Sequence, residues 1–577
     1  MSHYEKPRSG LATSNPTQHP APVLLNRIAI LLLLALPLGQ AAKRTGAVVT
    51  VHSLATKAAE QAFERSGNAV DAAVAAALTL GVVDGFNSGI GGGCFMLIRK
   101  PDGTFVAIDG RETAPLKASR DMFLRNDKAD PKLSRTGALA IGVPGALAAY
   151  DFATREHGNI HLAEHLGQAA TIAKDGFVLD KAYFHRLKQT VEKLRKFPDS
   201  ARIFLDPNGS AWPSGHRLKQ PDLARSYRKI ARHSANWFYR GPFALKTEEW
   251  MRANGGLITR EDLADYEAKR RKPVRSTYRG FEIVGFPPPS SGGVHVAQIL
   301  NILETFDLRS MPPNSPRFVH HVAEAMRLAF ADRAHWLGDA DFAPVPRGLV
   351  DKTYAKELAG RIRMDWAGKV ATHGQPPRST EDLFNKHTTH FSCADGDGNW
   401  VSCTATVNTS FGSKVIIPGT GVILNNEMDD FSSKPGVPNA FGLVGGEANA
   451  IEGDKRPLSS MTPTIVFKDD KPWLATGTPG GSRIITMVLQ VLLNVIDHGM
   501  NIAEATAAPR VHHQWLPDKL FVERGLSPDT LALLRQRGHN VLISRAAGSV
   551  QSVMTDPKGG FLGVSDSRRL GALAAGY

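Results

Sequence analysis

The sequence predicts an α+β protein in which strands from both halves of the chain share one core. Two observations predict this class. Apolar residues recur at helical spacing over 55–63 and 70–82, and far along the chain two runs of strand-like residues flank the turn at 395–399. Of the 577 residues, 42% are hydrophobic and 21% are charged, so the chain has an ordinary globular composition and can bury a large core.

The first expected element is an export signal at residues 1–42. Residues 28–38 form an uninterrupted apolar run that follows Arg27, and a Gly-Gln-Ala-Ala stretch comes next. This run is too short to span a bilayer. We therefore expect the mature chain to start near Ala42 or Lys43, in the periplasm or outside the cell, with no stable membrane span. The long leader before the apolar run leaves an uncleaved anchor as the alternative.

The elements of the mature chain follow from periodicity and turn residues. The expected order is helices 55–63 and 70–82, a Gly-rich turn at 85–93, a hairpin of strands 95–98 and 105–108, a helix at 318–337, a hairpin around 395–399, strands 465–467 and 473–476, and a helix at 484–496. The polar segment 360–386 lacks apolar periodicity, so we expect an exposed and flexible lead-in to residue 388.

The net charge of +14 does not by itself indicate a nucleic-acid partner. Basic residues are dispersed, and the densest run, 269–272, is expected on a solvated loop. No cofactor or metal is expected. His157, His161 and His165 recur at helical spacing, but Gly-Asn interrupts them and no Cys or carboxylate cluster completes a ligand set. The H-E-x-x-H, G-x-S-x-G and phosphate-loop signatures do not occur.

The cysteine content predicts a fold that depends on packing and not on a disulfide framework. Only Cys94, Cys393 and Cys403 are present. Cys393 and Cys403 lie on opposite arms of the second hairpin, and the sequence leaves open whether they bond.

The most informative segment begins at Thr388, with TTHFS at 388–392, DGDGN at 395–399 and TATVNT at 404–409. Further blocks are NAVDAA at 68–73, GIGGG at 89–93, DGRETAP at 109–115, VPG at 143–145, PPPSSGG at 287–293, LNNEMDDF at 424–431, RPLSSM at 456–461 and GTPGGSR at 477–483. Together, in this order, they resemble the γ-glutamyltranspeptidases, which are N-terminal-nucleophile hydrolases. The resemblance implies one interlocked four-layer αββα sandwich, built from both processed fragments.

The resemblance also implies that the chain cuts itself between His387 and Thr388. The Thr388 hydroxyl would attack the preceding carbonyl in an N-to-O acyl shift, which leaves a heterodimer of a large subunit, 43–387, and a small subunit, 388–577. The new α-amino group, with a pKa of roughly 7.7 to 8, could then accept the hydroxyl proton. Thr388 would take the γ-glutamyl group of glutathione or a related compound as an acyl-enzyme and pass it to water or to an amino acid or peptide.

The remaining site residues are carried over from the matching motifs. The expected roles are oxyanion binding by Gly480 and Gly481, a hydrogen bond to the nucleophile from Thr406, binding of the substrate α-carboxylate by Arg111, Ser459 and Ser460, and binding of its ammonium group by Asn408, Glu427 and Asp430. Some family members have Gln where this chain has Glu427, so the charge there stays open. Residues 431–447 resemble a flexible lid over the pocket.

Two alternatives remain at this point. One is a related acylase that removes β-lactam side chains on the same scaffold, although the set of Arg111, Asp430 and the two serines argues against it. The other is an exported binding protein that is never processed. The sequence does not rank hydrolysis against transfer, name the preferred donor or acceptor, or give the oligomeric state beyond the heterodimer.

Overall fold

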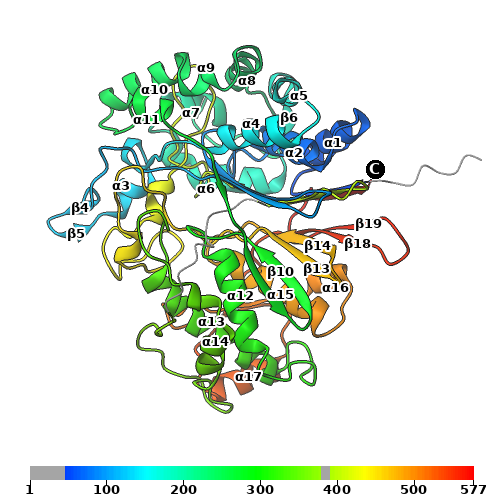
Figure 1. The fold of residues 1–577 in the computed structure, drawn as a ribbon. Helices are drawn as coiled ribbons and strands as arrows, with labels where there is room; N and C mark the ends of the chain where they lie inside the picture. Colours follow the sequence, from blue (N-terminus) through cyan, green and yellow to red (C-terminus); the bar gives the residue numbers. More distant parts are fainter. Residues whose placement is uncertain (1–45, 378–389, 577) are drawn as a thin grey trace, which may run out of the picture. The chain divides into compact units, whose positions relative to one another are not determined.

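Two antiparallel sheets lie face to face at the centre of the structure, a computed structural model that describes residues 46–377 and 390–576 (Figure 1). The first sheet has seven strands in the order β20-β1-β11-β12-β2-β3-β8. These are β1 (Gly46–Thr50), β2 (Gly93–Arg99), β3 (Phe105–Gly110), β8 (Lys269–Arg271), β11 (Phe391–Asp395), β12 (Trp400–Thr406) and β20 (Leu573–Gly576). The hairpin of β11 and β12 is therefore inserted between β1 and β2, which come from the start of the described chain.

The second sheet has six strands in the order β19-β18-β14-β13-β10-β9. These are β9 (Val274–Tyr278), β10 (Phe281–Gly285), β13 (Thr464–Lys468), β14 (Lys471–Gly477), β18 (Gln551–Thr555) and β19 (Phe561–Ser565). β10 pairs with β13, so this sheet also joins the two parts of the chain on either side of residue 388.

Apolar side chains fill the space between the two sheets. The Phe95 ring from β2 stacks on Phe286, which follows β10, with 4.8 Å between ring centroids. Leu97 and Ile465 belong to the same buried cluster. This inner core fixes one sheet on the other and so fixes the strand ends that surround the site.

Helices cover the outer face of the seven-stranded sheet. They include α1 (Ser53–Glu64), α2 (Ala69–Val83), α4 (Ala146–His157), α5 (Leu162–Asp175), α6 (Lys181–Leu194) and α8 (Pro221–His233). Every residue of α2 is buried. Its start is a capping box, in which the Asn68 side chain accepts from the N–H groups of Val70 and Asp71 while the Asp71 carboxylate accepts from the N–H of Asn68. The alanines of α2 let neighbouring elements approach closely.

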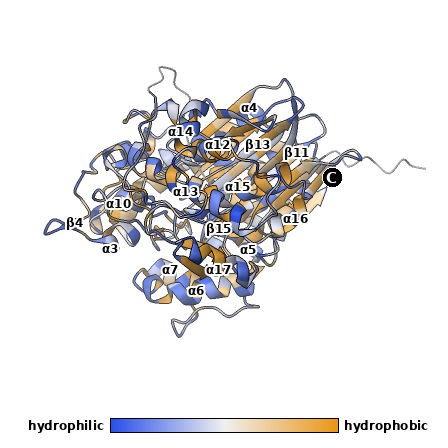
Figure 2. Ribbon diagram, turned by 90° about the horizontal axis from the view of Figure 1, so that it is seen from below, coloured by the Kyte–Doolittle hydropathy of each residue, from blue (hydrophilic) through white to orange (hydrophobic). Residues whose placement is uncertain are grey.

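A second helical layer covers the six-stranded sheet. It contains α12 (Gly292–Leu303), α13 (Pro316–Trp336), α14 (Lys352–Ala359), α15 (Arg483–Ile496) and α16 (Ile502–Ala507). Ser315 caps α13 by accepting from the N–H of Phe318, and Pro316 occupies the first helical position. In Figure 2 the strands are mainly orange and many outer loops are blue, as expected for sheets enclosed between helices.

The predicted fold class and the main predicted elements are confirmed. The helices expected at 55–63, 70–82, 318–337 and 484–496 correspond to α1, α2, α13 and α15, and both hairpins are present. Residues 44–577 form one compact unit, as the interlocked sheets require. Cys94, Cys393 and Cys403 are buried free thiols, which answers the question of whether the last two bond. No helix in 46–377 or 390–576 is long and apolar enough to cross a bilayer.

The expectation of a solvated loop at 269–272 was wrong, because Lys269–Arg271 is the edge strand β8. Arg271 pairs with the buried Asp109 at 3.3 Å and with Asp341 at 2.6 Å. An edge strand tolerates such charged side chains, and they discourage pairing with another chain. The basic run at 269–272 therefore marks an edge of the seven-stranded sheet.

The lead-in expected to be exposed and flexible spans 360–386, of which 378–386 lie outside the described residues; for the described part the expectation was only partly right. Many side chains of 361–377 are exposed, yet the backbone is tied down at several points. The N–H of Ala367 donates to the carbonyl of Arg537 at 2.7 Å, and the Trp515 indole donates to the carbonyl of Val370 at 2.8 Å. These partners are distant in sequence, so local periodicity could not reveal them.

Candidate active site

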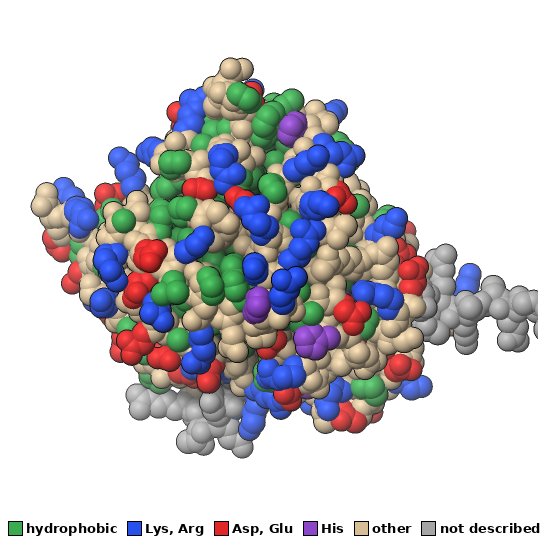
Figure 3. Space-filling view, turned by 90° about the horizontal axis from the view of Figure 1, so that it is seen from above, with side chains coloured by type: hydrophobic (Ala, Val, Ile, Leu, Met, Phe, Trp, Pro, Cys, Tyr) green, Lys and Arg blue, Asp and Glu red, His purple; other side chains and the backbone are tan. Residues whose placement is uncertain are grey.

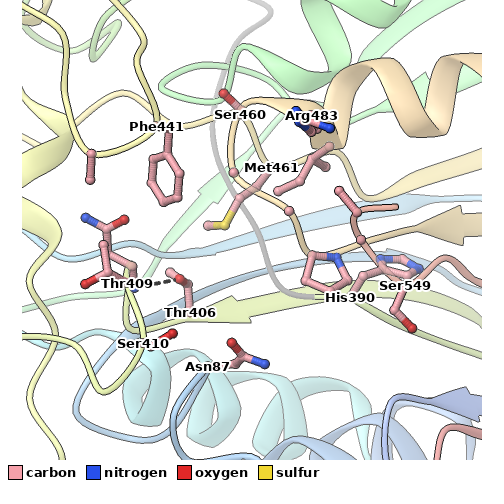
Figure 4. A pocket seen from close by; sticks show the side chains of 18 of the residues that line it. Asn87, His390, Thr406, Thr409, Ser410, Phe441, Ser460, Met461, Arg483 and Ser549 are labelled. Atoms are coloured by element: carbon pink, nitrogen blue, oxygen red, sulfur yellow. Dashed lines mark hydrogen bonds between the residues drawn. The ribbon is translucent and has the colours of Figure 1, made fainter. Parts of the chain in front are cut away.

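A cavity of about 730 Å³ is lined by Thr406, the last residue of β12 (Figure 4). Figure 4 shows Thr406, Thr409 and Phe441 on one side and Arg483 and Ser549 on the other. The predicted site residues that line it are Thr406, Asn408, Glu427, Asp430, Ser459, Ser460, Gly480 and Gly481. His387 and Thr388 lie outside the described residues. The structure thus brings together side chains from four separate sequence blocks.

Thr406 and Asn408 form a tight turn at the strand end. The N–H of Asn408 donates to the Thr406 hydroxyl at 2.8 Å, and Asn408 has a φ of 73°, a conformation that Asn tolerates better than most residues. Its side-chain amide donates to the carbonyl of Asn426 at 2.9 Å. The Asn408 side-chain oxygen has no hydrogen-bond partner among the described residues. It is therefore available as an acceptor beside the cavity.

Glu427 and Asp430 make an acidic wall, and Arg111 lies directly behind them. Both carboxylates belong to a single 3-10 turn, Glu427–Asp430. Arg111 is fully buried and donates through one nitrogen to Glu427 and through the other to Asp430, the second at 2.9 Å. It does not line the cavity. In this state the guanidinium fork that was expected to hold a substrate carboxylate is occupied by the two site carboxylates.

Glu112 adds a third carboxyl to this group. It is fully buried, one of its oxygens lies 3.7 Å from Arg111, and neither oxygen has a hydrogen-bond partner among the described residues. Burial raises the pKa of Glu112 to about 7, against the attraction of Arg111. Burial likewise raises the pKa of Glu427 and of Asp430. Burial alone would weaken the charge of Arg111, but the three carboxyls outweigh it and raise its pKa.

Ser459 and Ser460 lie beside a second buried cation, Arg333 of α13. Arg333 lines the cavity and donates to the Ser460 hydroxyl at 3.1 Å and to the Ser291 hydroxyl at 2.9 Å. Burial lowers the pKa of Arg333 to about 10, while the charge of Asp430 opposes that shift. Arg333 therefore stays charged at neutral pH and supplies positive potential next to both serines.

Gly480 and Gly481 form the loop that leads from β14 into α15. Their φ values of 149° and 60° lie in the region that favours glycine. A Cβ on Gly481 would overlap the ring of Phe441, which belongs to the segment 431–447 that was expected to act as a lid. Ala440, Phe441 and Leu443 all line the cavity. Backbone N–H groups at such a loop can approach a bound carbonyl closely.

His390 is the first described residue after the proposed nucleophile, and it also lines the cavity. Its ring hydrogen-bonds to the Ser392 hydroxyl at 2.7 Å and to the Thr404 hydroxyl at 3.3 Å. Burial lowers the pKa of His390 to about 3, so the ring is neutral at neutral pH. These contacts fix the start of β11 where it meets the cavity.

The charges at this end of the cavity suit a zwitterion. Glu427 and Asp430 line the cavity and offer carboxylate oxygens to a bound ammonium group. The serine hydroxyls and Arg333 would suit a carboxylate at the same time.

Sequence reasoning missed Arg333 and Glu112 as members of this site. Arg333 falls on α13 within the run 318–334, in which every residue is buried, and a charged side chain in such a run is a signal of a polar site. Glu112 follows Arg111 directly, but only the structure shows that its carboxyl is buried against the guanidinium.

Comparisons with known proteins agree with this geometry. Residues 55–576 match the family model for gamma-glutamyltranspeptidase. The chain is 47% identical over 537 residues to the glutathione hydrolase proenzyme of Escherichia coli (strain K12), with 92% of each chain covered. It is 42% identical over 547 residues to the glutathione hydrolase proenzyme of Pseudomonas sp. (strain A14), covering 92% of this chain and 94% of that one.

Among solved structures, cephalosporin acylase from Bacillus halodurans is similar with a TM-score of 0.82 and 26% identity, over 98% of this chain and 99% of that one. The chain is also 39% identical over 530 residues to the Acylase ACY 1 proenzyme of Pseudomonas sp. (strain SE83), covering 90% of this chain and 91% of that one, so acylases share both the fold and much of the sequence. The matched model spans almost the whole described chain. This protein belongs to the gamma-glutamyltranspeptidase family.

Proposed function

We propose that this protein is a γ-glutamyltransferase and glutathione hydrolase that uses Thr388 as its nucleophile. One observation carries the proposal: a single cavity is lined by the carboxyls of Glu427 and Asp430, by two serines beside the buried Arg333, and by a glycine pair, next to the start of β11. Arg111 lies directly behind the two carboxyls. A γ-glutamyl group is a zwitterion with an amide at its far end. Its ammonium group suits the two carboxyls, its α-carboxylate suits the serines and the nearby arginines, and its amide carbonyl suits the glycine pair.

The first step is scission before Thr388. The Thr388 hydroxyl attacks the carbonyl carbon of His387, the C–N bond breaks, and the nitrogen becomes the free α-amino group of Thr388. Water then hydrolyses the resulting ester, which leaves 43–387 and 388–577 as two subunits. Because each sheet contains strands from both parts, the subunits stay associated after the cut.

The second step is acyl transfer. The α-amino group of Thr388 accepts the hydroxyl proton, directly or through water, and the oxygen attacks the γ-glutamyl carbonyl. Gly480 and Gly481 donate N–H groups to the oxyanion, and Thr406 positions the nucleophile. The amine leaves with a proton, and water or a second amine then attacks the acyl-enzyme.

Substrate binding divides between the two charged groups of the glutamyl moiety. Asp430, Glu427 and Asn408 hold the ammonium group. The α-carboxylate lies against Ser459 and Ser460, with Arg111 as the expected cation. The Arg111 guanidinium already contacts the carboxylates of Glu427 and Asp430. It therefore binds the substrate by giving up one of these two contacts and forming one to the substrate α-carboxylate. Residues 1–42, which are not among the described residues, act as the export signal in this proposal.

Turnover of matched donors tests the proposal. The purified protein should release p-nitroaniline from γ-glutamyl-p-nitroanilide, and it should do so far more slowly from glutaryl-p-nitroanilide, which keeps the carboxylate and lacks only the α-ammonium group. Equal turnover of the two would favour the acylase reading, since the charged wall would then serve no purpose. A single uncut chain with no turnover of either donor would favour an unprocessed binding protein.

A further inference from the structure

The cavity continues beyond the glutamyl end into a region rich in arginine. Among the described residues, its lining there includes Arg186 of α6, Arg483 at the start of α15, Arg545 after β17 (Val541–Ser544), and Arg568 and Arg569 after β19. We call these five residues the arginine rim. Asp84 is the one carboxylate of the described lining at this end, since Glu427 and Asp430 lie at the other.

Two members of the arginine rim are neutralised by carboxylates. Arg569 pairs with Asp84 at 2.5 Å. Arg568 pairs with Glu523 at 2.7 Å and with Asp566 at 3.1 Å. These pairs hold the C-terminal strands to the rest of the fold and leave little charge for a ligand.

The other three members have no carboxylate within ion-pair distance among the described residues. Arg186 and Arg545 are exposed. Arg483 donates to the Ser544 hydroxyl at 3.1 Å and lies over the Phe521 ring at 4.9 Å, neither of which removes its charge. This end of the cavity therefore has an unbalanced positive charge.

The position of the arginine rim relative to the reaction follows from the lining. The glutamyl group fills the end with Glu427 and Asp430, and its carbonyl lies at Gly480 and Gly481. Arg483 follows Gly481 by two residues, so the rim begins where the scissile amide ends. The leaving amine must extend into this part of the cavity. An acceptor amine attacks along the path by which the leaving amine departs, so both occupy the same place.

We propose that the arginine rim binds the carboxylate of the amino acid or peptide that leaves from the donor or attacks as the acceptor. This inference rests on the proposed function and assigns the residues that bind the amino acid or peptide on the far side of the scissile bond. In the donor step the Thr388 oxygen forms an ester with the glutamyl carbonyl, the γ-amide C–N bond breaks, and the amine leaves with the proton that the hydroxyl gave up. In the acceptor step the incoming amine forms the new C–N bond, the ester C–O bond breaks, and the proton lost by the amine returns to the Thr388 oxygen. The guanidinium groups hold the carboxylate in both steps.

Pairs of substrates that differ only in this carboxylate test the inference. On the donor side, γ-glutamylglycine is compared with γ-glutamylglycinamide. On the acceptor side, glycylglycine is compared with glycylglycinamide, with γ-glutamyl-p-nitroanilide as donor. We expect the carboxylate form to have the higher kcat/KM in both pairs, by about fivefold for each charged contact at a partly exposed site. The preference should shrink as salt is raised from 0.01 M to about 1 M, because salt screens exposed charges.

The variants Arg545→Gln and Arg186→Gln should each reduce the ratio of carboxylate to amide kcat/KM, and Arg545→Lys should keep most of it. Neither arginine makes an ion pair with a described residue, so folding should tolerate both changes. Arg252→Gln on α10 (Pro242–Ala253) is the matched control, since Arg252 is highly exposed and lies outside the cavity. Its ratios should equal those of the wild type.

Two results would overturn the inference and leave the proposed function intact. One is equal kcat/KM for carboxylate and amide forms in both pairs, with normal turnover of γ-glutamyl-p-nitroanilide. The other is a preference that both glutamine variants and their double variant retain in full. A preference on the donor side alone would restrict the rim to the leaving group and overturn its acceptor role. Absence of any γ-glutamyl turnover would instead overturn the proposed function itself.

Discussion

Replacing Arg111 with lysine should abolish efficient use of γ-glutamyl donors while leaving scission of the chain intact. Arg111 donates to the carbonyl of Pro457 at 3.2 Å, to Glu427, and to Asp430 at 2.9 Å. A lysine ammonium keeps the positive charge but cannot reach all three acceptors, because they are arranged around a planar fork. At least one buried carboxylate then loses its charged hydrogen bond.

The size of the effect follows from that loss. A hydrogen bond to a charged group contributes about 1.5 to 3 kcal/mol. One such bond lost from the bound transition state corresponds to a fall in kcat/KM of about tenfold to a hundredfold, at about 1.4 kcal/mol for each factor of ten. We expect at least this fall for γ-glutamyl-p-nitroanilide, mostly through KM, since the chemical groups at Thr388 are untouched.

A matched control separates binding from general damage to a buried ion pair. Arg279 also bridges several acceptors, with 3.2 Å to Asp497, 3.1 Å to the carbonyl of Glu304 and 2.6 Å to the carbonyl of Phe306, but it does not line the cavity. Arg279→Lys should lower the Tm and keep kcat/KM. If Arg111→Lys kept wild-type kcat/KM and KM, the assignment of this end of the cavity to the glutamyl group would be wrong.

Three further changes should have equally specific results. Thr388→Ala should leave one uncut, inactive chain on a denaturing gel, and a cut chain would contradict the role of that hydroxyl. Gly481→Ala should lower kcat about tenfold or more, because the new Cβ overlaps Phe441 and the φ of 60° disfavours alanine; an unchanged kcat would remove the oxyanion assignment. Glu112 has a folded-state pKa of about 7, above its unfolded value of 4.5. Between these two pH values the folded state keeps a proton that the unfolded state has lost, so the free energy of unfolding of the wild type falls as pH rises from about 4.5 to 7. Glu112→Gln cannot ionise, so its Tm relative to wild type should rise between pH 5 and 8, and a pH-independent difference would show that Glu112 is not protonated in the fold.

Local patterns were enough to predict the main elements of the fold. The helix α15 has thirteen buried residues in succession after a glycine pair, and the hairpin of β11 and β12 has a Gly/Asp turn between strand-like runs. Such patterns involve only residues that are close in sequence, so they can be recognised without the tertiary structure. The four-layer αββα arrangement came only from the family resemblance, and the order of the strands in each sheet was not predicted.

Features that depend on distant partners could not be predicted in this way. The basic residues of β8 looked like a solvated loop because Asp109 and Asp341, which pair with Arg271, are far away in the chain. The resemblance named Arg111, but it did not show that the guanidinium is held by Glu427 and Asp430. The contribution of Arg333 to the site follows from the packing of α13 beside Ser460, which is a property of the assembled fold.

Intact mass and N-terminal sequencing of the purified, active protein test the central proposal most directly. We expect two polypeptides, of which the smaller begins Thr-Thr-His-Phe-Ser at Thr388. Both should be present in equal amounts, because each sheet needs strands from the two of them. An active protein that consists of one continuous polypeptide through residues 387 and 388 would contradict it.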